Sequence, residues 1–304
     1  MKYLITNYDV QLFQQIISLN QRNLKTVLSK FLNRRYKKVI ENEFFLCAIG
    51  EIPVGLVAHL DTVFSKTPST IVYGQDSKIM WSPEGLGADD RAGVYAITKL
   101  IRMGLKPTVI FTVDEELGCV GAQKLIEQFK HPFTKINYLI ELDRRGSNDC
   151  VFYDCDNKNF ISYIESFGYK EAKGTFSDIS VIGEAWKVAA VNLSVGYYNE
   201  HSCSETLNFS ELFNTIFQVY KMLNEKIIPE FSFVKKESIY TCNKCGKMLN
   251  KVDLVPVMDK TESYNLYCID CLVDKIKLCK KCFTPFDFED ECDLCPKCRK
   301  DSLN

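Results

Sequence analysis

The sequence has little of several features that would define its class at once. Its 304 residues include only three histidines, and 38 basic and 39 acidic residues leave a formal net charge of −1. No segment approaches the ~18 to 20 consecutive apolar residues that span a bilayer. Without a strong positive charge there is no global field to attract nucleic acid or anionic lipid. We therefore expect a small or peptidic ligand, and neither a membrane nor a nucleic acid as the partner.

The N-terminal segment also lacks the features of a secretion signal. Its apolar positions are interrupted by polar residues, and neither a long apolar region nor a small-residue cleavage site is present. We therefore expect a cytoplasmic protein. Of the fourteen cysteines only five lie in the first 230 residues. Because disulfides are rare in the reducing cytoplasm, the other nine, between Cys242 and Cys298, are expected to bind metal.

The spacing of apolar residues predicts an α/β domain over residues 1–230, followed by a cysteine-rich tail over residues 231–304. Helices are expected at 9–32, 94–103, 120–129, 158–168, 178–185 and 208–225, and strands at 44–49, 53–58, 71–73, 78–81, 107–114, 135–143, 149–153 and 187–196. Apolar runs such as TVIFTV and NYLIEL indicate a sheet that is buried on both faces. The expected architecture is a three-layer α/β/α sandwich with a mostly parallel mixed sheet.

Polar side chains occur at the ends of these expected strands or in the loops beside them. They are His59, Asp61, Asp89, Asp90, Glu115, Glu116, Asp143 and His201. In an open α/β sheet the carboxyl ends of parallel strands form the ligand crevice, so these groups can converge there. Carboxylates brought together repel one another unless cations lie between them. The pattern therefore favours a pair of divalent metals.

Each cluster also has an ordinary structural explanation. Asp89 and Asp90 fit a helix N-cap, and Glu115 and Glu116 fit an exposed helix start. Asp143 precedes two arginines and fits a surface ion pair, which contributes ~0 to 1 kcal/mol. What favours the metal hypothesis is that all the clusters occur together, in order, at strand ends. Asp61 lies two residues after His59, so it can face the imidazole and fix its tautomer.

Taken together, the motifs HLDTV, GLGADDRAG, DEELG, ELD and EHS followed by Glu205 resemble the di-zinc exopeptidases over residues 50–225. The resemblance implies that Asp89 bridges two metals and that the Asp89-Asp90 peptide bond is cis. It assigns His59 and Asp143 to one metal and Glu116 and His201 to the other. Glu115 would be the general base, taking a proton from a water that the cations acidify. These ligands suit two catalytic zinc ions, and cobalt or manganese can occupy the same sites.

Other residues near these motifs carry weaker signals. Ser177 and Asp178 resemble a pair near the substrate pocket of the family, but a helix N-cap is the preferred interpretation. Cys203 and Glu205 are expected only to border the site, and His131 is expected in a surface loop. Many carboxypeptidase and deacylase members insert a lid domain between the Asp143 ligand and the late histidine. Here 57 residues separate Asp143 from His201, so no lid domain is expected.

The cysteine-rich tail has the spacing of two four-thiolate sites. Four Cys-x2-Cys pairs predict a small zinc-ribbon module in which the closed sites are structural. The expected ligands are Cys242, Cys245, Cys268 and Cys271 for one zinc, and Cys279, Cys282, Cys295 and Cys298 for the other. Cys292 is an alternative to Cys295 or Cys298. Basic and acidic residues are nearly balanced there, which favours a protein contact or a packing role over nucleic-acid binding.

The leading hypothesis is a metallopeptidase that removes N-terminal residues from short peptides. An amidohydrolase or deacylase of N-acyl amino acids is the second possibility, because the same metal centre attacks any amide carbonyl. The third is a catalytically silent scaffold that recruits partners through its zinc ribbons. A complete ligand set together with Glu115 argues against a silent scaffold, which has no need of a base.

Overall fold

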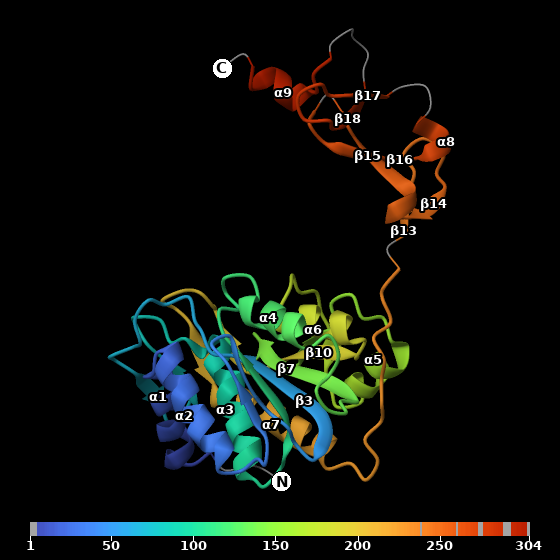
Figure 1. The fold of residues 1–304 in the computed structure, drawn as a ribbon. Coiled ribbons are helices and arrows are strands. Elements are labelled where there is room, and N and C mark those ends of the chain that lie inside the picture. Colours follow the sequence, from blue (N-terminus) through green and yellow to red (C-terminus); the bar gives the residue numbers. More distant parts are fainter. Residues whose placement is uncertain (1–4, 238, 260, 273–275, 288–292, 303–304) are drawn as a thin grey trace. The chain divides into compact units, whose positions relative to one another are not determined.

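The computed structural model describes residues 5–237, 239–259, 261–272, 276–287 and 293–302. The chain divides into two compact units, Met1–Lys235 and Lys236–Asn304 (Figure 1). The sequence prediction had placed this boundary at residue 230. Within the described residues, no helix combines the length and apolar character that crossing a membrane requires.

The larger sheet of unit 1 is mixed and parallel in its middle. Its eight strands run in the order β1 (Val39–Glu41), β2 (Phe45–Ala48), β6 (Pro107–Thr112), β3 (Ile52–His59), β7 (Tyr138–Arg144), β10 (Ala190–Ser194), β8 (Asp149–Val151) and β9 (Lys170–Glu171). Strand β3 pairs in parallel with β6 and β7, and β7 pairs in parallel with β10. The carboxyl ends of β6, β3 and β7 therefore meet at one end of the sheet.

Helices cover both faces of this sheet (Figure 1). One face packs against α1 (Asn7–Ile17), α2 (Gln21–Asn33), α3 (Ala88–Arg102) and α7 (Phe209–Leu223), and the other against α4 (Val120–Gln128) and α6 (Asp178–Trp186). Neighbouring strand residues alternate between the two cores, since Leu56 lies in the first and Val57 in the second. The predicted three-layer α/β/α class is confirmed. The remaining helix of unit 1, α5 (Lys158–Glu165), contacts β9.

Local capping explains where several helices begin. Thr6 and Asp9 form a capping box at the start of α1. The side chain of Asn20 accepts a hydrogen bond from the backbone of Asn23 at the start of α2, and Asn208 does the same for α7. Each helix is amphipathic, so its apolar side packs on the sheet.

A second, smaller sheet in unit 1 is antiparallel and has the order β11 (Tyr197–Tyr198), β12 (Thr206–Asn208), β5 (Ile79–Trp81) and β4 (Val72–Gly74). Strands β4 and β5 were predicted from the sequence, whereas the two-residue β11 and the three-residue β12 were not. The connection between β11 and β12 contains His201. This sheet therefore brings a late part of the sequence to the end of the main sheet.

Unit 2 is built from short strands and two short helices. The hairpin of β13 (Ile239–Thr241) and β14 (Met248–Asn250) precedes the 3-10 turn η1 (Lys251–Asp253) and a four-stranded sheet. That sheet has the order β16 (Tyr264–Cys268), β15 (Leu254–Met258), β18 (Pro285–Asp287) and β17 (Ile276–Leu278), and the helices are α8 (Ile269–Leu272) and α9 (Pro296–Lys300). Strand β15 pairs with both β16 and β18, so one sheet links the two cysteine groups.

Candidate metal centre

Three neighbouring strands carry most of the expected site residues to the same end of the main sheet. His59 is the last residue of β3, Asp143 lies near the end of β7, and Glu115 and Glu116 follow β6. Because β3 lies between β6 and β7, these side chains are brought together by the strand order itself. Asp89 joins them from the start of α3, across one face of the sheet.

The carboxylate of Asp89 lies between the two histidines. Its Oδ1 is 3.2 Å from His59 Nε2, and its Oδ2 is 3.2 Å from His201 Nε2. His59 Nε2 also lies 3.5 Å from Asp143 Oδ1, whereas His201 Nε2 lies 2.9 Å from Glu116 Oε1. The five residues thus form two half-sites that share one carboxylate.

These distances are compatible with metal binding as well as with direct hydrogen bonds. Asp89, Glu116 and His201 offer ligand atoms that all lie within 4.8 Å of one another, and so do His59, Glu115 and Glu116. A zinc ion binds nitrogen and oxygen ligands at ~2.0 to 2.2 Å, so two of its ligand atoms can be at most about 4.4 Å apart. The four histidine–carboxylate separations of the half-sites, 2.9 to 3.5 Å, lie inside that limit. The residues present therefore fit two divalent ions.

Asp90 is also close to His59 and Asp143, but its carboxylate is used by the backbone. Its Oδ2 accepts a hydrogen bond from the backbone N–H of His59 at 3.3 Å, and its Oδ1 accepts one from Gly93 at 2.9 Å. Asp90 therefore acts as the helix cap that the sequence had suggested for the Asp89-Asp90 pair, while Asp89 faces the histidines. The peptide bond between Asp89 and Asp90 is cis, as the resemblance implied.

Asp61 contacts residues of both half-sites as well as Glu115. Its carboxylate accepts hydrogen bonds from the backbone N–H groups of Glu115 and Glu116, both at 3.0 Å, and its Oδ1 lies 3.2 Å from His59 Nδ1. Burial alone would raise the pKa of Asp61, but the contacts with His59 and with these two N–H groups hold it below its ordinary value. A charged Asp61 leaves Nε2 of His59 free to face the site.

Glu115 is the buried carboxylate beside the half-sites. Only 8% of the residue is exposed, and its Oε2 lies 4.0 Å from His59 Nε2. Burial raises the pKa of Glu115 to about 7. Cys119, at the start of α4, places its thiol 3.6 Å from Glu115 Oε1. The alternative of an exposed helix start does not hold for Glu115.

The clustered carboxylates of the site repel one another, and positive charge between them would reduce that repulsion. Burial raises the pKa of Asp143 well above its ordinary value, and the neighbouring Asp89 raises it further. Asp89 itself is kept charged, because hydrogen bonds with His201 and His59 outweigh its burial and lower its pKa. The carboxylates of Asp89 and Asp143 thus compete for the protonated imidazole of His59. Divalent cations would relieve this repulsion, which the chain's own residues leave in place.

Glu205 has a more direct role than the sequence suggested. It is fully buried, and its two carboxylate oxygens accept hydrogen bonds from the backbone N–H groups of Gly87 and Asp89, the latter at 3.1 Å. Glu205 therefore holds the backbone that carries the shared ligand. Its position four residues after His201 indicated in the sequence that it borders the site. The pairing of β12 with β5 places the preceding Glu205 where it reaches the backbone of Gly87 and Asp89.

Asn192 on β10 is a second supporting residue, and no pattern in the sequence indicated it. Its side-chain oxygen accepts a hydrogen bond from the backbone N–H of Asp143 at 3.0 Å, and its amide donates to the carbonyl of Asp143 at 2.7 Å. The same amide lies 3.2 Å from the hydroxyl of Tyr153. Asn192 thus fixes the backbone at the end of β7 from the neighbouring strand.

The residues with weaker sequence signals have definite places in the structure. Ser177 is the N-cap of α6, which confirms the preferred interpretation, and its hydroxyl donates to the buried carboxylate of Glu141. Asp178 is buried and bonded to Thr112. His131 and Cys203 are both exposed, and neither lines the cleft described next. The ion pair proposed for Asp143 is not formed among the described residues.

A cleft of about 370 Å³ opens over the half-sites. Its floor is formed by Glu115 and by four of the expected ligands, Asp89, Glu116, Asp143 and His201. Its walls are formed by Arg144, Arg145, Tyr153, Lys173, Gly174, Thr175, Phe176, Asn192, Tyr197 and Glu200. The two arginines pair with carboxylates other than Asp143. Arg145 bonds to Glu200 at 2.8 Å, and Arg144 lies 3.5 Å from Asp149. The cleft has room for a small or peptidic substrate next to the metal half-sites.

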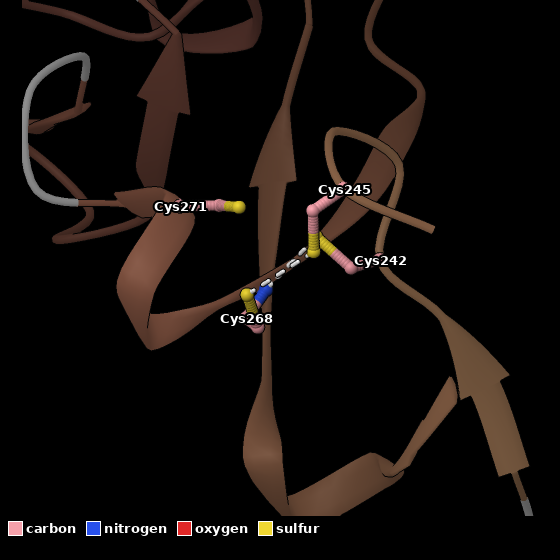
Figure 2. A group of neighbouring side chains, drawn as sticks. All are labelled: Cys242, Cys245, Cys268 and Cys271. Atoms are coloured by element: carbon pink, nitrogen blue, oxygen red, sulfur yellow. Dashed lines mark hydrogen bonds between the residues drawn. The ribbon is translucent and has the colours of Figure 1, made fainter. Parts of the chain in front are cut away.

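The eight predicted cysteines of unit 2 gather into two groups of four. Figure 2 shows the first group, in which the thiols of Cys242, Cys245, Cys268 and Cys271 converge. Cys245 Sγ and Cys268 Sγ are 3.7 Å apart, and so are Cys282 Sγ and Cys295 Sγ in the second group. Tetrahedral zinc with Zn–S bonds of ~2.3 Å places sulfurs about 3.8 Å apart, whereas a disulfide would place them at about 2.05 Å. Both groups match the zinc-ribbon prediction.

Backbone groups favour the thiolate form in the first cysteine group. The N–H of Cys268 donates to Cys242 Sγ at 3.3 Å, which lowers the pKa of that thiol to about 6. The thiolate is the form that binds zinc. Cys292, the alternative ligand, lies outside the described residues.

Comparisons with known proteins agree with this geometry. Residues 50–175 match the family model described as Peptidase family M28. Unit 1 is a metallopeptidase domain. The matched segment of this metallopeptidase domain includes His59, Asp89, Glu115 and Asp143, and it ends before His201. The sequence has no significant match among curated proteins.

Solved structures share the fold of the metallopeptidase domain. The aminopeptidase PepT from Bacillus cereus ATCC 10987 is 16% identical with a TM-score of 0.57, over 71% of this chain and 97% of that one. A tripeptidase from Staphylococcus aureus subsp. aureus Mu50 is 13% identical with a TM-score of 0.58, over 71% and 96%. The aminopeptidase APDkam598 from the archaeon Desulfurococcus kamchatkensis is 14% identical with a TM-score of 0.54, over 73% and 96%.

Proposed function

We propose that unit 1 is a di-zinc aminopeptidase that removes N-terminal residues from short peptides. The observation that carries the proposal is the position of Asp89, whose two carboxylate oxygens each lie 3.2 Å from a different histidine. A shared carboxylate between two His-carboxylate half-sites is the arrangement that two neighbouring cations require. The names of the similar solved structures, two aminopeptidases and a tripeptidase, support a peptide substrate.

In this proposal His59, Asp89 and Asp143 hold one ion, and Asp89, Glu116 and His201 hold the other. Bound there, two divalent cations would polarise the scissile carbonyl and increase the acidity of a water molecule. Zinc suits this nitrogen and oxygen donor set, and cobalt or manganese can replace it.

The chain's own residues would then handle the proton. Glu115 reaches the half-sites without belonging to either, so it can take a proton from water and pass it to the leaving amine. Asp61 holds the backbone of Glu115 and orients His59, which makes it a positioning residue. The walls of the cleft exclude bulk water from one side of the reaction.

The cysteine groups of unit 2 are proposed to hold two structural zinc ions. Four thiolates leave no open coordination position, so no reaction is assigned to them. A protein partner for unit 2 and a cytoplasmic location stay predictions from the sequence.

The test measures metal content and hydrolysis together on the full chain. We expect four zinc ions per chain, and hydrolysis of alanine and leucine p-nitroanilides that is lost by at least ~10²-fold in Glu115→Gln with the zinc content unchanged. Glu127→Gln, on the exposed side of α4, is the matched control. Activity that survives Glu115→Gln would remove Glu115 from its role.

The alternative hydrolase function is separated by the substrate panel. Hydrolysis of N-acetylated amino acids, with no reaction on peptides that have a free amine, would favour a deacylase. Zinc binding without hydrolysis of either substrate class would favour the silent scaffold.

A further inference from the structure

The cleft of the metallopeptidase domain has walls of unequal charge. Outside the proposed metal ligands and Glu115, its lining contains three cationic side chains, Arg144, Arg145 and Lys173, and one anionic side chain, Glu200. Positive charge on the walls therefore exceeds negative charge by two. This reasoning rests on the proposed function, because two divalent ions would neutralise the four carboxylates of the floor and leave the wall charges to act on the substrate.

These three cationic side chains differ in how closely they pair with carboxylates of the protein. Arg145 is the best paired, since its guanidinium lies 2.8 Å from Glu200. Arg144 lies 3.5 Å from Asp149, longer than the ~2.7 to 2.9 Å of a charge-assisted hydrogen bond. Lys173 forms no ion pair among the described residues. Arg144 and Lys173 thus keep unused capacity to bind an anion.

Their location places this capacity beside the reacting bond. Arg144 directly follows the proposed ligand Asp143, and its side chain is only 16% exposed. Lys173 comes from the segment between β9 and α6, which forms another part of the wall. A planar guanidinium and a flexible ammonium at the same cleft match the two oxygens of a carboxylate.

We propose that the basic wall, formed by Arg144, Arg145 and Lys173, binds a carboxylate that the substrate carries next to the scissile bond. Two chemical groups can supply it. One is the acidic side chain of an N-terminal glutamate or aspartate, and the other is the terminal carboxylate of a dipeptide. Arg144 is the main anchor because it is largely buried, where screening by water is weaker. Lys173, which is exposed, contributes less.

The experiment compares two matched substrate pairs with the zinc-loaded full chain. Glutamate p-nitroanilide against alanine p-nitroanilide tests the acidic side chain, and Ala-Ala against Ala-Ala amide tests the terminal carboxylate. We expect kcat/KM to be about tenfold higher for the anionic member of at least one pair. That pair identifies the source of the carboxylate.

The variants show whether the basic wall causes the preference. Arg144→Gln is expected to reduce the preference, taken as the ratio of kcat/KM for the anionic and the neutral member of a pair, by about tenfold and Lys173→Gln by about threefold. Lys173→Glu should reduce it further. Lys170→Gln is the matched control, because Lys170 is exposed on the same segment and does not line the cleft. Equal rates for both members of each pair, or a preference that survives Arg144→Gln and Lys173→Gln, would overturn the proposal.

A binding measurement separates this proposal from the proposed function. Titration calorimetry with zinc-loaded Glu115→Gln should show that free glutamate binds more tightly than glutamine, or that Ala-Ala binds more tightly than Ala-Ala amide, and that Arg144→Gln removes the difference. Equal binding within both pairs would refute the basic wall even in an active enzyme. Preferential glutamate binding without hydrolysis of any substrate would refute only the aminopeptidase.

Discussion

Glu205 offers the sharpest test of how unit 1 supports its metal centre. Its two carboxylate oxygens accept hydrogen bonds from the backbone N–H groups of Gly87 and Asp89, and the side chain is fully buried. Glu205→Gln keeps the shape but turns one acceptor into an NH2 group that opposes an N–H donor. Burial raises the pKa of Glu205 to about 7, so the test is made at pH 8, where the carboxylate is mostly charged. Because hydrogen bonds to a charged acceptor contribute ~1.5 to 3 kcal/mol, we expect the free energy of unfolding to fall by about that amount.

The same substitution should weaken the metal centre. In the proposed function Asp89 is the ligand that both half-sites share, so a shift of its backbone would affect both ions at once. Loss of a supporting partner typically reduces metal affinity by about 10- to 100-fold. We therefore expect Glu205→Gln to lose zinc to a competing chelator at correspondingly lower chelator concentration, and to regain activity when zinc is in excess.

Glu211→Gln provides the matched control for this measurement. Glu211 lies six residues later and accepts a hydrogen bond from Tyr198 at 2.7 Å, away from the half-sites. The Glu211→Gln variant should lose little stability and no zinc affinity. If Glu205→Gln binds zinc as tightly as the unmodified protein and keeps its kcat/KM, the reasoning that Glu205 positions Asp89 is refuted.

Two further predictions concern the rest of the chain. Burial alone would raise the pKa of Asp9, but hydrogen bonds with Lys99 and Thr6 hold it below its ordinary value, so Asp9 adds stability above about pH 4 that is lost as the pH falls through its lowered pKa. Asp9→Asn should cost about 2 kcal/mol in urea unfolding at pH 7 and less at pH 3, and an equal cost at both pH values would contradict this. Cys279→Ser should release one structural zinc and disrupt unit 2, measured by zinc content and circular dichroism, while anilide hydrolysis by unit 1 is unchanged. A matching loss of hydrolysis would show that unit 1 depends on unit 2.

Local sequence patterns predicted most of the elements of unit 1. The apolar runs that became β6 and β7 are buried on both faces of the sheet, so their composition alone identified them. The strands β11 and β12 were missed because, unlike the equally short β4 and β5, they contain none of the Phe, Val, Ile or Trp residues by which short strands were recognised. Helix α3 begins at Ala88, six residues before the predicted start at Val94. Its first turn is irregular, since Asp89 and Asp90 depart from helical geometry.

The candidate metal residues were also predicted from the sequence, because each stands at the end of a recognisable element and the motifs occur in a characteristic order. Their supporting residues were not. Asn192 lies inside an ordinary buried strand, and its contact with Asp143 depends on β10 pairing with β7. No pattern in the chain near residue 192 indicates that partner.

The sequence by itself determined the class of the fold and the two cysteine quartets, because periodicity and short-range spacing are local properties of the chain. The five side chains offered as metal ligands came from its resemblance to the di-zinc exopeptidases. Only the tertiary structure decided that Asp89 faces both histidines while Asp90 caps α3, that Glu205 holds the Asp89 backbone, and that Arg144 and Lys173 line the same cleft. Apart from the local contact of Asp90 with Gly93, these relations join residues from about 30 to more than 100 positions apart, and strand pairing and side-chain packing alone bring them into contact.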